Sequence, residues 1–348
     1  MDWERTLDFY GSLIEKRLED YFSDLIKSAR FYHRMIGEVY QNIYMFSSRK
    51  GKRLASCSTL LTYKGYSNEI NEKILNVCVG IELYRHHILV HDDLIDQDNF
   101  RRGEKSFHNI FSSFYDKRFG TGLAVFGGDL ILGLALQCIL KSGFSIQKLE
   151  KVIKLIVDGF CEVNESQILD LLFEYTNPNK NEWLMMVDKR AASLFKTTML
   201  TGAILGDAPE HEINLLIEIA KNIGYSFDIQ DDIIDTFATK KQYGRKPGRD
   251  IILGKKPLHI LIMRQNASRN EWNLLKDIKE KKYITKAQLE SIKNSIIKTG
   301  ALRDAKFELK KHTEITKNLL VQTNMINEIK DFFLSFIKYI EVSLDWYK

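Results

Sequence analysis

Two segments with the same acidic pattern, residues 92–96 (DDLID) and 231–235 (DDIID), constrain this chain more than any other feature. Each places three aspartates inside an otherwise apolar stretch. Unpaired buried charge is costly and clustered carboxylates repel, so a doubly charged cation is expected at each segment. Residues four apart share a helix face, which pairs Asp92 with Asp96 and Asp231 with Asp235. Hard oxygen ligands of this kind suit Mg²⁺, which completes its shell with water and substrate phosphates. The pattern predicts a magnesium-dependent diphosphate site.

The rest of the chain is expected to be helical. Only four prolines occur in 348 residues, and apolar residues recur every three to four positions. We expect an all-α protein built as one large helical bundle, a single domain over residues 1–348. The expected helical ranges are 4–45, 69–96, 120–141, 146–174, 181–205, 211–237 and 258–346, with a loop over 244–257.

Composition excludes several classes of protein. A net charge of +5 is explained by lysines on helix surfaces, and no base-reading or stacking element is evident, so no nucleic-acid partner is expected. The scattered residues Cys57, Cys78, Cys138 and Cys161 indicate reduced core thiols in a cytoplasmic protein. No signal peptide is evident, and Asp129 with a Gly-Gly pair makes the apolar segment 123–140 a buried core helix rather than a stable membrane insertion.

Basic segments follow both acidic ones. Residues 101–103 (RRG) come shortly after the first, and residues 244–255, which end in Gly254-Lys255, come after the second; residues 50–53 (KGKR) form a further basic turn. Alone, each is more often solvated surface charge. Beside a magnesium site, guanidinium and ammonium groups can bind phosphate oxygens, and a glycine-rich basic loop can close over an anion. Lys189-Arg190 is compatible with ordinary surface charge.

The order of these motifs resembles that of the trans-type isoprenyl diphosphate synthases. The resemblance spans roughly residues 45 to 260 and includes 127–130 (GGDL), and segment 89–103 is most similar to archaeal geranylgeranyl diphosphate synthases. It implies the isoprenoid synthase fold, a helical bundle with a central cavity, and a homodimer. It also implies an allylic prenyl diphosphate and isopentenyl diphosphate as substrates, with Mg²⁺, three ions per active site, as the cofactor.

The resemblance also implies roles for individual residues. Asp92, Asp96 and Asp231 would coordinate Mg²⁺, with Asp93, Asp232 and Asp235 in support. Arg101 would bind the allylic diphosphate, Arg102 and Lys52 would bind isopentenyl diphosphate, and Lys189 and Lys255 would assist ionisation. The remaining substrate-binding candidates are Arg53, Arg85, Gln167, Asp228 and Arg245.

Several positions depart from the family pattern. Ala55 stands where a second arginine is usual, and Arg85 stands where His or Gln is usual, so we hypothesise that Arg85 restores the missing cation. Arg245 replaces a lysine. Asp228 replaces a glutamine and Arg190 a threonine, and the opposite charges predict that these two residues pair.

Product length is expected to depend on the helix that carries the first acidic segment. Tyr84, His87 and Ile88 precede Asp92 by eight, five and four residues, the positions whose bulk sets product length in related enzymes. If Tyr84 and His87 close the end of the cavity into which the product chain grows, forming its floor, the product is predicted to have twenty carbons, as in geranylgeranyl diphosphate. Plain core packing of all three residues is the alternative.

The motifs of other functional classes fit this sequence less well. A class I terpene cyclase usually carries a different second metal motif, and a squalene- or phytoene-type synthase carries two DxxxD motifs. A non-catalytic subunit of a heteromeric synthase tends to lose one aspartate cluster, whereas this chain keeps both. A farnesyl or longer polyprenyl diphosphate synthase stays open as an alternative.

Overall fold

The computed structural model describes residues 3–239 and 247–343. Within these ranges the protein is helical apart from one short hairpin, which confirms the all-α prediction. The chain divides into two compact units, and α7, α9 and α17 contribute to both. The first unit holds residues up to Leu155 with 198–209 and 325–329, and the second holds 156–197, 210–324 and the residues from Lys330. That the whole chain is one domain stays a prediction.

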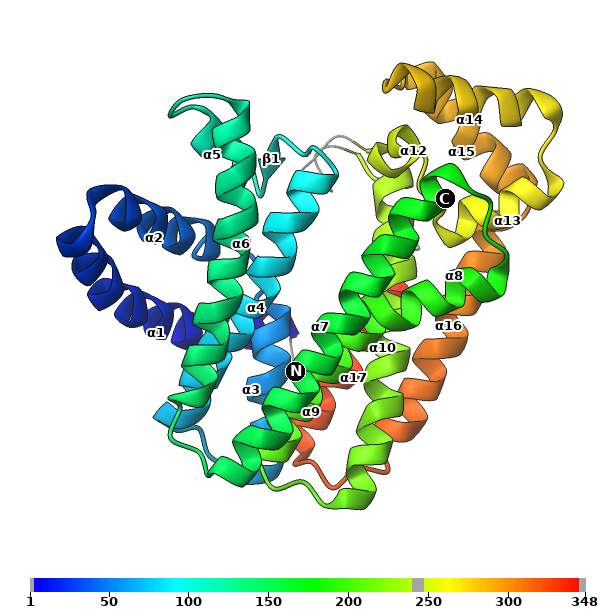
Figure 1. Cartoon of the computed structure of the whole chain (residues 1–348). Coiled ribbons are helices and arrows are strands. Elements are labelled where there is room, and N and C mark those ends of the chain that lie inside the picture. Colours follow the sequence, from blue (N-terminus) through cyan, green and yellow to red (C-terminus); the bar gives the residue numbers. More distant parts are fainter. Residues whose placement is uncertain (1–2, 240–246, 344–348) are drawn as a thin grey trace. The chain divides into compact units, whose positions relative to one another are not determined.

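The first unit begins with two helices that pack on each other as a hairpin (Figure 1). Their boundary is marked by His33, whose ring accepts a hydrogen bond from Met35 N–H. The elements of this unit are α1 (Trp3–Tyr32), α2 (Arg34–Ser47), α3 (Leu54–Ser67), α4 (Glu72–Ile95), β1 (Phe100–Arg101), β2 (Glu104–Lys105), α5 (Phe107–Ser112), α6 (Lys117–Leu140) and the start of α7 (Ile146–Tyr175).

The core of the first unit is the contact of α4 with α6. Asn71 caps the start of α4, and Asp116 caps the start of α6 through a 2.7 Å bond from Phe119 N–H. The two helices approach closely at Gly128, where a Cβ atom would lie 2.2 Å from the ring of His91. This contact fixes the helix that ends in the first aspartate cluster.

Helix α6 is long and apolar enough to cross a membrane by length and composition alone, and no other helix of the described ranges is. Of its most apolar window, 44% is buried, mainly against α4 and α5. The sequence predicted a buried core helix here, and the helix is buried on one face. Its other face exposes Val125, Phe126 and Leu140.

The second unit is built around α10, which packs along α16. Its elements are the rest of α7, α8 (Lys180–Val187), a π-helical turn η1 (Asp188–Ala192), α9 (Ser193–Leu205, in part), α10 (Glu210–Phe237), α12 (Arg249–Leu253), α13 (Leu258–Asn266), α14 (Arg269–Lys281), α15 (Lys286–Lys298), α16 (Ala301–Leu320) and α17 (Asn327–Ser343).

Four features differ from the sequence predictions. Residues 100–105 form a two-stranded hairpin, an element that the all-α prediction does not include, and Arg102 and Gly103 both adopt positive φ in its two-residue turn. The helix expected over 181–205 is interrupted by η1, and the loop expected over 244–257 contains the short helix α12. Cys161 is exposed, although Cys57, Cys78 and Cys138 are buried as predicted, and all four are free thiols. The cytoplasmic location inferred from them stays a prediction.

Candidate active site

The first aspartate cluster lies at the C-terminal end of α4, where the helix ends at Ile95 and Asp96 is the C-cap. Arg101, on β1, binds two of its members: Nε lies 2.7 Å from Asp93 Oδ1, and Nη2 lies 3.1 Å from Asp92 Oδ2. Asp93 is fully buried, while Asp92 and Asp96 are half-buried. Asp93 therefore fixes the geometry of the cluster, and Asp92 and Asp96 remain accessible.

The charge on Asp93 is only partly compensated. Burial raises the pKa of its carboxyl group to about 6, against the lowering effect of Arg101. Its Oδ2 atom is buried and has no hydrogen-bond partner among the described residues. A buried carboxylate oxygen without a hydrogen-bond partner fits a site that binds a cation together with its substrate.

Basic residues of two turns lie next to this cluster and are clamped to each other. Arg49 donates to the carbonyl oxygens of Arg101 (3.3 Å) and Lys105 (2.8 Å), and Arg102 donates back to the carbonyl of Arg49 at 3.0 Å. The guanidinium of Arg102 packs on Gly51 so closely that a Cβ there would lie 2.6 Å from it. The basic turn and the hairpin turn thus form one cationic surface.

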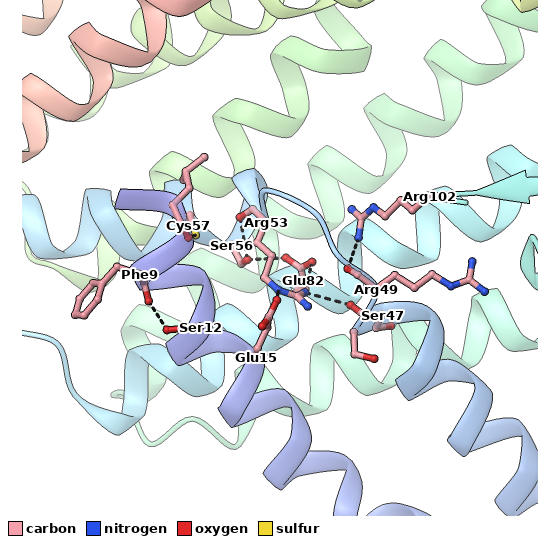
Figure 2. Close-up of polar contacts among 12 residues, drawn as sticks. Phe9, Ser12, Glu15, Ser47, Arg49, Arg53, Ser56, Cys57, Glu82 and Arg102 are labelled. Carbon is pink, nitrogen blue, oxygen red and sulfur yellow. Dashed lines mark hydrogen bonds and ion pairs between the residues drawn. The ribbon is translucent and has the colours of Figure 1, made fainter. Parts of the chain in front are cut away.

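Lys52 and Arg53 of the basic turn differ in exposure. Lys52 is half-exposed, 3.2 Å from Glu4 and 3.7 Å from Asp8, beside a pocket of about 540 Å³ that α1 forms with residues 50–52. Arg53 is buried and binds Glu15 and Glu82, each at 2.8 Å (Figure 2). Lys52 can therefore meet a substrate directly, whereas Arg53 holds the turn in place.

Arg85 lies one helical turn after Glu82 on α4 and is half-buried. Its positive charge, together with those of Arg53 and Arg101, adds to burial in lowering the pKa of Arg102, while Glu82 opposes them. Arg85 therefore belongs to the same basic cluster as Arg102, as its proposed compensation for Ala55 requires. The compensation itself stays a prediction.

The candidate chain-length residues lie on the part of α4 that packs against α6. Tyr84 and His87 are buried, and His87 Nδ1 lies 3.1 Å from the carbonyl oxygen of Gly128. Their rings are 6.5 Å apart, and Ile88 is half-buried. These contacts favour a packing role for His87. The role of the three residues in product length stays a prediction.

The second aspartate cluster lies near the end of α10 and is organised by Arg190 of the π-helical turn. Arg190 binds Asp228 through two bonds, of 2.9 and 2.6 Å, and also lies 3.3 Å from Asp170 and 3.9 Å from Asp232. The predicted pair of Arg190 with Asp228 is confirmed. Burial opposes the guanidinium charge, but the surrounding carboxylates outweigh it and raise the pKa of Arg190 well above its ordinary value.

The turn reaches the cluster because α10 has no side chain at Gly224, where a Cβ would lie 2.4 Å from Cα of Ala192. π-helical turns recur at functional sites, where they redirect a side chain from the regular helical face. Here the turn directs Arg190 to the acidic residues, while the preceding Lys189 binds Glu165. Lys189 is more than one-third exposed.

The three members of the second cluster have different surroundings. Asp231 is exposed. Asp232 is mostly buried, and burial together with the charge of Asp228 raises its pKa well above the ordinary value; its Oδ2 atom has no hydrogen-bond partner in the described ranges. Asp235 is buried and accepts a 3.2 Å bond from Asp250 N–H, so it holds the start of α12.

The remaining predicted residues of this unit lie nearby or fall outside the described residues. Lys255 binds Asp170 at 3.1 Å and so joins the Arg190 network. Gln167, one turn before Asp170 on α7, is half-buried. Arg245 lies outside the described residues. Among those described, no group of three or more His, Cys, Asp or Glu side chains is arranged to hold a metal by itself. That both aspartate clusters line one cavity, which the family resemblance implies, stays a prediction.

Three residues that organise these clusters are not among the predicted site residues. Arg49 and Glu82 are buried in the first unit, and Asp170 links Arg190 with Lys255 in the second. Glu82 carried a usable signal, since it is one acidic residue within the apolar stretch of α4. Asp170 is marked by its place after Gln167 in the order of motifs that resembles the family, whereas Arg49 carried no signal that separates it from surface charge.

Comparison with known proteins identifies relatives over most of the chain. The family model described as polyprenyl synthetase matches residues 36–296. A short chain isoprenyl diphosphate synthase of Methanocaldococcus jannaschii is 31% identical over 267 residues, 77% of this chain and 75% of the relative. A geranylgeranyl diphosphate synthase of Sulfolobus acidocaldarius is 25% identical over 92% of this chain and 96% of its own length.

The fold is shared with solved structures. The crystal structure of a geranylgeranyl pyrophosphate synthase from Corynebacterium glutamicum, complexed with isoprenyl diphosphate and magnesium, superimposes with a TM-score of 0.89. The match covers 98% of this chain and 99% of that one at 19% identity, and this degree of likeness concerns the fold alone.

Proposed function

The chain belongs to the polyprenyl synthetase family and is a prenyltransferase, and we propose that it joins an allylic prenyl diphosphate to isopentenyl diphosphate head to tail. One observation carries this proposal: both aspartate clusters are intact, and each is organised by a resident arginine, Arg101 or Arg190. A chain that had lost catalysis would have no reason to keep two such acidic clusters.

The donor set of each cluster fits magnesium. Asp92 and Asp96 would hold it in the first cluster and Asp231 in the second, with Asp93 and Asp232 contributing the charge of their unsatisfied buried oxygens. Magnesium, when bound, supplies Lewis-acid stabilisation of the negative charge on a departing diphosphate. The number of ions, predicted to be three, stays a prediction.

The remaining residues act on the two substrates. Arg101 and Lys255 each neutralise carboxylates at present and would turn toward the allylic diphosphate, where Lys189 and Gln167 would assist. Lys52, Arg85 and Arg102 would bind isopentenyl diphosphate. Apolar surroundings would protect the allylic cation from water until the new carbon–carbon bond forms.

We propose geranylgeranyl diphosphate as the product. The support is the name of the Sulfolobus relative, which aligns over nearly its whole length, and the bulk of Tyr84 and His87 before the first cluster. The Methanocaldococcus relative, a short chain synthase, is compatible with this length. A farnesyl or longer product would mean that residues other than Tyr84 and His87 limit the length of the growing chain.

We also propose that the enzyme is a homodimer. The exposed apolar side chains Val125 and Phe126 on α6 and Ile146 and Val157 on α7 support this proposal, since apolar surface of this kind is often covered by a partner. Light scattering after gel filtration should give twice the mass of 40.6 kDa. A monomer at micromolar concentration would contradict the dimer and leave the proposed reaction untouched.

The reaction is tested with purified protein, Mg²⁺, radiolabelled isopentenyl diphosphate and each allylic primer in turn. We expect a labelled twenty-carbon product that disappears with a metal chelator. Absence of any labelled product from the purified chain, with recovery on adding a homologous subunit, would identify the non-catalytic alternative instead.

A further inference from the structure

Glu82 is a buried carboxylate at the centre of the basic cluster in the first unit. It lies in the middle of α4 between Ile81 and Leu83, both fully buried, and is itself 2% exposed. Arg53 Nη1 lies 2.8 Å from Oε1, and Ser56 Oγ lies 2.5 Å from Oε2 (Figure 2). A charge in such a position is retained only where cations and donors compensate for its lost hydration.

The pair of Glu82 with Arg53 closes the basic turn. Arg53 precedes α3 with φ of 46°, a left-handed conformation that is unfavourable for a residue with a side chain. Its Nη1 also donates to the carbonyl of Ser47 at 3.1 Å, so one guanidinium joins the end of α2, the start of α3 and Glu82. Lys52 is the adjacent residue, and its backbone position follows from this anchor.

The same carboxylate acts on Arg102 through its charge. Burial and the neighbouring Arg85, Arg53 and Arg101 all disfavour the charged form of Arg102, and Glu82 opposes them. Arg102 in turn packs on Gly51 and donates to the carbonyl of Arg49. Removal of the negative charge at Glu82 would leave the guanidinium groups of Arg53, Arg85 and Arg102 to repel one another.

We propose that Glu82 is a positioning residue for isopentenyl diphosphate: its buried charge fixes the basic turn and Arg102 so that Lys52 and Arg102 can bind one diphosphate. This inference rests on the proposed function, in which these residues form the isopentenyl diphosphate subsite. The side chain of Arg101 is held by Asp92 and Asp93, which do not contact Glu82, so we expect binding of the allylic substrate to depend less on Glu82 than binding of isopentenyl diphosphate does.

The test uses three variants of the full-length protein. Glu82→Gln keeps the size and one acceptor oxygen but removes the charge and the second acceptor, and Glu82→Asp keeps the charge on a shorter side chain. Glu15→Gln is the matched control, because Glu15 binds the same Arg53 at 2.8 Å but is half-exposed, and exposed ion pairs contribute little. For each variant, kcat and the two Michaelis constants are measured together with the melting temperature.

We expect Glu82→Gln to raise KM for isopentenyl diphosphate about tenfold, while KM for the allylic substrate changes less than about twofold. Glu82→Asp should give an intermediate value, and Glu15→Gln should behave like the wild type. A role in packing alone predicts the reverse order, with Gln tolerated better than Asp, because Gln matches the size of Glu.

Equal changes in both Michaelis constants, or none, would overturn the inference. If Glu82→Gln does not fold, Glu82→Asp alone decides by the same criterion of a selective effect on isopentenyl diphosphate. A wild-type protein without turnover would instead overturn the proposed function, and this inference with it, so the two failures are distinguishable.

Discussion

Arg190 and Asp228 form a two-point ion pair, with Nε 2.9 Å from Oδ1 and Nη2 2.6 Å from Oδ2. The side chain of Asp228 is 8% exposed and that of Arg190 is 23% exposed. The pair places one fixed positive charge among Asp170, Asp228 and Asp232. Arg190 therefore offsets the mutual repulsion of these three carboxylates.

A double-mutant cycle tests how strongly this pair is coupled. Arg190→Gln and Asp228→Asn should each lower the free energy of unfolding by about 3–5 kcal/mol, because each leaves a partner buried and uncompensated. The double variant should lose at least about 1 kcal/mol less than the sum of the two single variants. Urea unfolding measures all three, and additive losses would show that the two residues act independently.

The control for this cycle is a more exposed ion pair of the same unit. Lys180 and Glu308 lie 2.7 Å apart with side chains 49% and 25% exposed. Lys180→Gln should cost less than about 1 kcal/mol, the usual range for such pairs. If Lys180→Gln lost as much stability as Arg190→Gln, burial could not explain the large loss expected for Arg190→Gln.

Replacement of Arg85 tests the compensation for Ala55. Arg85 adds its charge to the cluster around Arg102, so Arg85→Ala should raise KM for isopentenyl diphosphate several-fold with little change in the melting temperature. Arg118→Ala, at an exposed arginine near the start of α6, serves as the control. An unchanged KM in Arg85→Ala would refute the compensation.

Two aspartates of the second cluster, Asp231 and Asp235, should have different roles. Asp231 is exposed and Asp235 is buried with a bond to Asp250 N–H. Asp231→Asn should lower kcat about a hundredfold or more and raise the Mg²⁺ concentration for half-maximal rate, at an unchanged melting temperature. Asp235→Asn should lower the melting temperature as well. Equal melting temperatures for the two variants would contradict a structural role for Asp235.

The helices and the acidic ends of α4 and α10 could be predicted because their signals are local. Apolar periodicity and few prolines define a helix over ten or more residues. The charges of Arg190 and Asp228, combined with the departures from the family pattern, were enough to predict their pairing. Opposite charges at two unusual positions carry information that single positions do not.

The remaining features depend on contacts that no short segment encodes. The π-helical turn at residues 188–192 requires Gly224 on another helix and carboxylates that receive Arg190. The hairpin at residues 100–105 is stabilised by Arg49, which lies far away in sequence. Glu82 could be recognised as unusual, but its partners Arg53 and Ser56 become neighbours only when α3 packs on α4.

The chain-length prediction is tested by removal of the two bulky side chains. His87→Ala with Tyr84→Ala should lengthen the product by one or more five-carbon units if these residues form the floor. Because His87 also contacts Gly128, the double variant should lose about 3–5 kcal/mol of stability from the cavity alone. Chromatography of the labelled products decides, and unchanged chain length in a folded variant would leave packing as the role of both residues.

His259 should make the stability of the protein sensitive to acid. It is fully buried on α13, where Nε2 lies 2.9 Å from Thr236 Oγ1, and burial lowers its pKa to about 3. The unfolded chain binds a proton near the ordinary value of about 6.5 and the folded protein does not, so unfolding takes up a proton as the pH falls below that value. The stability contributed by the neutral ring is complete above about pH 6.5 and is lost progressively toward pH 3. At pH 5 this one residue should account for a loss of about 2 kcal/mol.

His259→Gln, which keeps a polar side chain but cannot titrate, should remove that part of the acid sensitivity. The difference in free energy of unfolding between wild type and variant should therefore shift by about 2 kcal/mol in favour of the variant between pH 7.5 and pH 5. His211→Gln is the control, since the side chain of His211 is 70% exposed. Parallel pH profiles for wild type and His259→Gln would show that His259 takes up its proton in the folded protein as readily as in the unfolded chain.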